Sequence, residues 1–117
     1  MKVFAYPLVT DGNMGGSITS SPQQLTEMAM ACIQAVFTGS PVGTFKLQIS
    51  ANYQEDSMGN VLNAGTWTDY TGSSQGISAA GDFAWNLSTT PYPWIRLVYT
   101  RTSGSGTLNA TINGKGV

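Results

Sequence analysis

The chain contains the same strand–turn–strand pattern twice. The first copy runs from Val36-Phe37-Thr38 through a Gly/Ser/Pro turn into Gly43-Thr44-Phe45-Lys46-Leu47-Gln48-Ile49. The second runs from Val98-Tyr99-Thr100 through a Gly/Ser turn into Gly106-Thr107-Leu108-Asn109-Ala110-Thr111-Ile112. After each turn, apolar and polar residues alternate strictly, which is typical of strands with one buried face. The pattern predicts two β-hairpins, with Gly43 and Gly106 as structural turn residues where a side chain or a negative φ would fit poorly.

Further one-sided strands are predicted elsewhere, over residues 2–10, 30–38, 83–88 and 94–101. Residues 23–32 have high helix propensity but only a thin apolar stripe, so we favour a turn or extended segment that leads into the strand at 30. These signals predict an all-β fold, a single antiparallel β-sandwich of about eight strands over residues 1–117. Residues 1–20 could form an N-terminal arm.

The composition is poor in charge. Only 9% of the residues are charged, against roughly 25% in an ordinary soluble domain. A net charge of -1 contributes little to solubility. The surface is therefore expected to be polar and neutral, and covered by other copies or by a larger assembly. The alternative is a protein kept soluble by its hydroxyl and amide groups alone.

The charge pattern also bears on partners. Three lysines and two arginines are spread along the chain, which argues against binding to nucleic acid or to an anionic membrane. No stretch is apolar enough for a signal peptide or a membrane span. The single cysteine, Cys32, excludes an intramolecular disulfide and is expected to be a buried, unreactive thiol of a chain that folds in a reducing cytosol.

No catalytic constellation is visible. The chain has no histidine, which excludes serine–histidine and cysteine–histidine catalysis and histidine metal sites. Glu55, Asp56 and Asn60 could offer oxygen ligands to calcium, but their spacing is not that of a dedicated site, and a solvated loop is the favoured interpretation. No cofactor motif is present. We expect no enzymatic activity, no cofactor and no resident metal.

Aromatic residues are the remaining candidates for a binding site. Trp67, Tyr70, Tyr92 and Trp94 could form a platform for sugars or an interface. Packing in the core is the alternative, and it is favoured for Trp85, which shares a strand face with Phe83 and Leu87. Arg96 is expected to make a cation–π contact or an ion pair, with Asp69 and Asp82 as candidate partners.

Parts of the chain resemble known families. The segments Leu47-Gln48-Ile49-Ser50, Trp67-Thr68-Asp69 and Trp94-Ile95-Arg96-Leu97 are similar to galactose-binding-like jelly-roll domains. A broader resemblance, from Ile33 to Val117, is to small virion structural proteins of tailed bacteriophages. It is carried by Val42-Gly43-Thr44-Phe45-Lys46-Leu47-Gln48, by residues 94–104 and by Gly106-Thr107-Leu108-Asn109-Ala110.

The phage resemblance implies a jelly-roll-like sandwich in a virion, without chemistry. The expected function is that of a capsid decoration or cement protein, or of a head or tail appendage, acting by self-association and docking. The expected partners are copies of the chain, as a trimer or dimer, and other virion proteins such as the major capsid protein. The alternative is a carbohydrate-binding module that contacts host or mucosal glycans.

Overall fold

The computed structural model of the protein describes residues 3–25, 29–87 and 93–116. Within these segments the regular structure consists of strands, with no helix. The all-β prediction is confirmed. The strands are β1 (Val3–Asn13), β2 (Ile18–Thr19), β3 (Gln23–Gln24), β4 (Met30–Gly39), β5 (Val42–Ser50), β6 (Gln54–Glu55), β7 (Val61–Asn63), β8 (Thr68–Asp69), β9 (Gln75–Ile77), β10 (Gly81–Leu87), β11 (Trp94–Ser103) and β12 (Gly106–Lys115).

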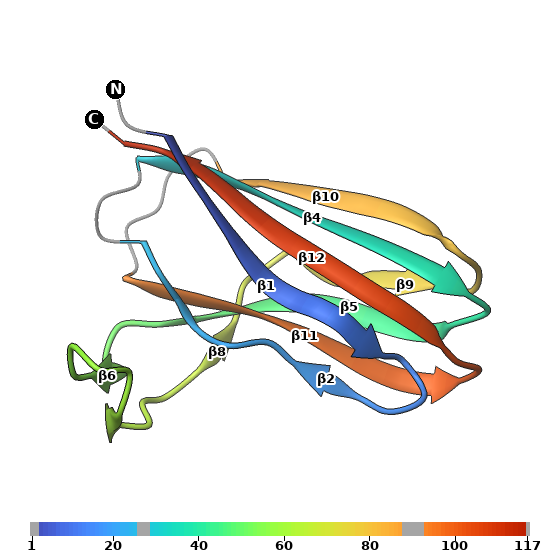
Figure 1. Ribbon diagram of the computed structural model, residues 1–117, viewed down its shortest axis with the longest axis horizontal. Helices are drawn as coiled ribbons and strands as arrows, with labels where there is room; N and C mark the ends of the chain where they lie inside the picture. Colours follow the sequence, from blue (N-terminus) through green and yellow to red (C-terminus); the bar gives the residue numbers. More distant parts are fainter. Residues whose placement is uncertain (1–2, 26–28, 88–92, 117) are drawn as a thin grey trace.

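Two sheets form a sandwich (Figure 1). The first sheet has the order β1-β12-β4-β10, and the second has the order β2-β11-β5-β8, with β3 added to β11 and β9 added to β5. The described strand pairs are antiparallel, and β1/β12, β2/β11, β4/β10 and β5/β8 are nested one inside the next along the chain. A long ribbon of nested pairs rolled into two sheets is the jelly-roll arrangement. Eight strands therefore form the two main paths, and four short strands complete the twelve.

The prediction of two hairpins is wrong. β4 and β5 lie in different sheets, and so do β11 and β12, so each copy of the repeat crosses from one sheet to the other. The copies pair with one another instead, β4 with β12 and β5 with β11. Phe37 lies opposite Leu108, and Tyr99 lies opposite Phe45. A one-sided strand has the same alternation whether its neighbour in sequence is in its own sheet or in the facing sheet, so periodicity could not distinguish the two.

The core lies between the sheets and is centred on Phe45. The ring of Phe45 contacts those of Tyr99, Phe37 and Trp85 at centroid distances of 5.0, 5.4 and 5.9 Å. Trp85 is 7% exposed, as predicted for a core residue, and its Nε1–H donates to the carbonyl of Ser73 at 2.8 Å. Aromatic contacts of this kind add to the stabilisation that burial alone provides.

The first twenty residues do not form a separate arm where the structure describes them. β1 pairs with β12 from Val3 to Asn13, and β2 pairs with β11. Leu8 belongs to the hydrophobic core and Met14 is fully buried. The apolar alternation at the N-terminus therefore serves a strand of this sandwich. Residues 26–28 of the ambiguous segment 23–32 lie outside the described residues, while Gln23–Gln24 is extended and Met30 begins a strand.

Replacing Tyr99 by phenylalanine is expected to stabilise the protein by about 1 kcal/mol. The Tyr99 hydroxyl is buried and has no hydrogen-bond partner among the described residues. Burial raises the pKa of Tyr99, against the opposing effect of the Arg101 charge. The folded state disfavours the ionised phenol, so stability is retained below pH 10 and lost as the pH rises above it. Urea unfolding at pH 7 and pH 10.5 should show a larger advantage for Tyr99→Phe at the higher pH, and an equal advantage at both would contradict this.

Candidate functional site

The outer face of the first sheet is nearly free of charge. Cross-strand partners point to the same side of a sheet, so the register identifies the residues that share this face. They are Val3, Ala5 and Pro7 on β1, Asn109, Thr111, Asn113 and Lys115 on β12, Met30, Cys32, Gln34 and Val36 on β4, and Asp82, Ala84 and Asn86 on β10. Among the described residues assigned to this face by the register, Lys115 and Asp82 are charged, and they lie near its opposite ends. The neutral surface expected from the composition is thus gathered on one sheet.

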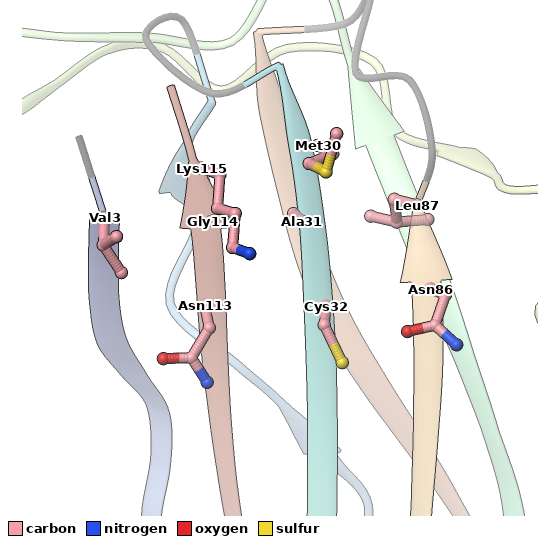
Figure 2. A pocket seen from close by; sticks show the side chains of 9 residues that line it. All are labelled: Val3, Met30, Ala31, Cys32, Asn86, Leu87, Asn113, Gly114 and Lys115. Atoms are coloured by element: carbon pink, nitrogen blue, oxygen red, sulfur yellow. The ribbon is translucent and has the colours of Figure 1, made fainter. Parts of the chain in front are cut away.

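This face is hollowed near the chain termini (Figure 2). The hollow has a volume of about 320 Å³. Side chains and backbone from β1, β12, β4 and β10 line it, namely Val3, Met30, Ala31, Cys32, Asn86, Leu87, Asn113, Gly114 and Lys115. Cys32 is half-buried on the outer face and not in the core as predicted, because its neighbours Ala31 and Ile33 point inward. Of the described lining residues, Lys115 is charged and the others are apolar or carry an amide group.

The outer face of the second sheet carries charged side chains that are joined by hydrogen bonds. Lys46 Nζ lies 3.2 Å from Asp69 Oδ1, and Gln48 Nε2 donates to the same carboxylate at 3.0 Å. These contacts, chiefly that of Gln48 and then that of Lys46, lower the pKa of Asp69. The side chains come from β5 and from β8, which pairs with it. A polar, hydrogen-bonded array therefore covers this sheet.

Arg96 on β11 continues that array and makes the predicted cation–π contact. Its guanidinium carbon lies 4.3 Å from the ring centroid of Trp67, and its Nε–H donates to Gln48 Oε1 at 2.8 Å. Burial lowers its pKa. The predicted ion pair is absent from the described contacts. Asp69 is engaged by Lys46 and Gln48, and Asp82 lies on β10 of the other sheet.

The candidate aromatics form a packed cluster and not an open platform. Trp94 is 8% exposed, and Tyr53 packs edge-on against it at 4.8 Å. Tyr53 also contacts the half-buried Trp67 at 5.5 Å. Tyr70 packs against the core from the side, and Tyr92 lies outside the described residues. Tyr53 escaped the sequence interpretation, although an isolated aromatic in a polar loop is a signal that it could cover a sheet.

Glu55, Asp56 and Asn60 lie together in the hairpin formed by β6 and β7. Asp56 Oδ1 accepts hydrogen bonds from the backbone N–H groups of Met58 and Asn60, each at 2.9 Å, and these bonds, with the Asn60 side chain, lower its pKa. Glu55 Oε2 accepts from the Tyr53 hydroxyl at 2.8 Å, and burial and Glu55 raise the pKa of that tyrosine. The acids are used to hold the turn. In the described segments no group of three or more Cys, Asp or Glu side chains could hold a metal ion.

The tip of this hairpin exposes large apolar side chains. Met58 is 86% exposed, Leu62 is 68% exposed and Val61 is 56% exposed. Figure 1 shows the hairpin standing off the end of the sandwich that also carries the chain termini, on the side of the second sheet. The prediction of a solvated loop around Glu55, Asp56 and Asn60 did not include this apolar tip, since Val61-Leu62 is too short a run to signal a surface feature.

Comparison with known proteins identifies the fold but no family. No protein-family model and no curated protein sequence matches the chain. Among the described residues no helix is long and apolar enough to cross a membrane. The structure is similar to that of the SPBc2 prophage-derived protein YomS, with a TM-score of 0.55, 9% identity, and coverage of 97% of this chain and 94% of that one.

A second similar structure is a chain of infectious bursal disease virus, Gt strain, with a TM-score of 0.51 and 14% identity. The similarity extends over 96% of this chain, which corresponds to only 31% of the length of the viral chain. At these identities the likeness concerns the fold. The sandwich is thus an architecture that also occurs in a prophage-derived protein and in a virus.

Proposed function

We propose that this chain is a non-enzymatic structural protein of a bacteriophage virion, a capsid decoration protein or a component of a head or tail appendage. The observation that carries the proposal is the outer face of the β1-β12-β4-β10 sheet, which is broad, neutral and partly apolar. Met30 and Val36 are 47% and 46% exposed on it, and Val3 is 72% exposed. Such a face suits burial against another protein, because little charge has to be desolvated.

The fold supports the same proposal. The architecture is similar to that of a prophage-derived protein over nearly the whole of both chains. It is also similar to part of a viral chain. The edge strands of the sandwich add a further reason for assembly. Open edges are usually protected by charge, and β10 carries a single charged residue over its seven positions. Closed association of copies, or docking on a capsid protein, would cover such surfaces without forming fibres.

The purified chain is therefore expected to be a homo-oligomer, a trimer or a dimer, at micromolar concentration. Val36→Lys would place a charge on the proposed contact face, on the row that pairs with Asp82, and should shift the chain to monomer without unfolding it. Thr100→Lys is the matched control, since Thr100 is exposed on β11 of the other sheet. Sedimentation velocity measures the oligomeric state of both variants, and circular dichroism checks that they are folded. A wild-type monomer at these concentrations would contradict the proposal.

Glycan binding is the second candidate, and one observation favours it. Arg96 lies over the half-buried Trp67 ring beside Gln48 and Asp69, which places hydrogen-bonding groups next to an aromatic edge. Binding on a glycan array that is lost in Trp67→Ala, together with a monomeric wild type, would support this candidate over the structural one. The buried state of Trp94 leaves little open ring surface for sugar stacking.

A further inference from the structure

The β6–β7 hairpin presents an apolar tip with acidic flanks. Its exposed apolar residues are Met58, Val61 and Leu62. Glu55 lies opposite Val61, Asp56 lies in the turn, and residues 54–63 include no lysine or arginine. Asp56 fixes the turn through hydrogen bonds from Met58 and Asn60. The tip is therefore held in shape before any partner arrives, which lowers the entropic cost of binding.

The hollow on the first sheet has complementary properties. Val3 and Met30 supply exposed apolar surface, and Lys115 supplies a positive charge. The described residues that line it include no acidic side chain. Its volume of about 320 Å³ is at the lower end of ligand-sized pockets and suits one or two aliphatic side chains.

The hairpin of a chain and the hollow of the same chain lie on opposite sides of the sandwich. The hairpin connects β5 and β8 of the second sheet, whereas the hollow opens on the outer face of the first sheet. Figure 1 shows the hairpin near the end of the sandwich that carries the termini, on the side of the second sheet. The hollow is lined by residues close to the termini, such as Val3 and Lys115. A second copy is the partner that offers the complementary element at the same concentration.

We propose that the β6–β7 tip of one copy inserts into the hollow beside Lys115 of a second copy. The proposal rests on the proposed function, because it names one contact of the proposed self-association. Leu62 would fill the apolar part of the hollow, and the acidic side chains of the hairpin would bring negative charge near Lys115. The contact joins two different surfaces and is heterologous, so repetition closes a ring where the rotation permits it.

Two single substitutions test the contact from its two sides. Leu62→Asp damages the tip but leaves the hollow intact, and Lys115→Glu repels the acidic hairpin but leaves the tip intact. Both positions are exposed, so neither change should affect folding. Each variant alone should associate at least tenfold more weakly than the wild type. An equimolar mixture should form a one-to-one pair, because the tip of the Lys115→Glu chain meets the hollow of the Leu62→Asp chain.

Arg101→Glu is the matched control for charge reversal, since Arg101 is exposed near the far end of β11. Sedimentation velocity should show the wild-type oligomer for this variant. If the wild type is an oligomer and both test variants match it, the inference is overturned while the proposed function stands. If the mixture forms no pair, the heterologous contact is overturned. A wild-type monomer up to about 100 µM would overturn both the contact and the proposed function.

Discussion

Alanine at Gly106 or at Gly43 is expected to destabilise the protein by about 2–3 kcal/mol, which is roughly 10 °C in Tm for a domain of this size. A Cβ at position 106 would overlap the carbonyl oxygen of Thr38 and lie 3.4 Å from Pro41 Cδ. A Cβ at position 43 would overlap the carbonyl oxygen of Thr100 and lie 2.8 Å from the Tyr99 hydroxyl. Backbone atoms in paired strands cannot move aside without breaking their register.

The control for this prediction is Gly76→Ala. Gly76 also lies in a strand, β9, but a Cβ there would meet nothing within 4 Å. Its φ is not in the left-handed region, so alanine is expected to leave stability unchanged or raise it by about 0.5 kcal/mol. Thermal unfolding followed by circular dichroism compares the three variants. Equal Tm changes in all three would show that close packing at positions 43 and 106 has no special role.

The two glycines also show how the two copies of the sequence repeat contact each other in the fold. In each copy the glycine that opens the second strand lies against a threonine carbonyl of the other copy, Gly43 against Thr100 and Gly106 against Thr38. The expectation of a left-handed φ at these positions is not met, because neither is among the residues with positive φ. The sequence could identify the positions but not the cause, since the close approach arises between strands far apart in the chain.

Strand positions and inward-facing residues could be read from the sequence because they depend on local alternation. Phe45 and Leu47 were expected to face inward, and both are fully buried. Sheet membership could not be read in the same way. Whether β5 returns beside β4 or crosses to the facing sheet depends on which long-range pairs bury the most surface, and the short turn at Ser40 and Pro41 permits either.

The surface features were harder to predict for a related reason. The segment between β5 and β8 folds back so that Tyr53 covers Trp94 and Trp67 meets Arg96. These contacts join a loop to the face of a sheet, and they have no periodic signature in sequence. The uncharged outer face of the first sheet was partly foreseen from composition, but its extent required the register of its strands.

Deleting residues 1–10 is expected to abolish cooperative folding. These residues supply most of β1, which pairs with β12 along its length, and they include Leu8, which is 6% exposed within the core. Loss of one buried leucine side chain typically costs about 2–5 kcal/mol, against a total stability of about 5–15 kcal/mol for a small domain. Deletion would also leave the backbone of β12 as a new open edge, which favours aggregation.

Point substitutions on β1 distinguish the effect of losing one buried side chain from the effect of removing the whole strand. Leu8→Ala is expected to cost about 2–4 kcal/mol, whereas Thr10→Ala should stay within about 0.5 kcal/mol because Thr10 is exposed. Urea unfolding of both variants, with the heteronuclear NMR spectrum of the truncated chain, makes the comparison. A truncated chain with dispersed resonances and a sharp unfolding transition would mean that β1 is dispensable to the sandwich. That result would favour an N-terminal segment that acts as an arm, because its apolar residues would then have no structural use within one chain.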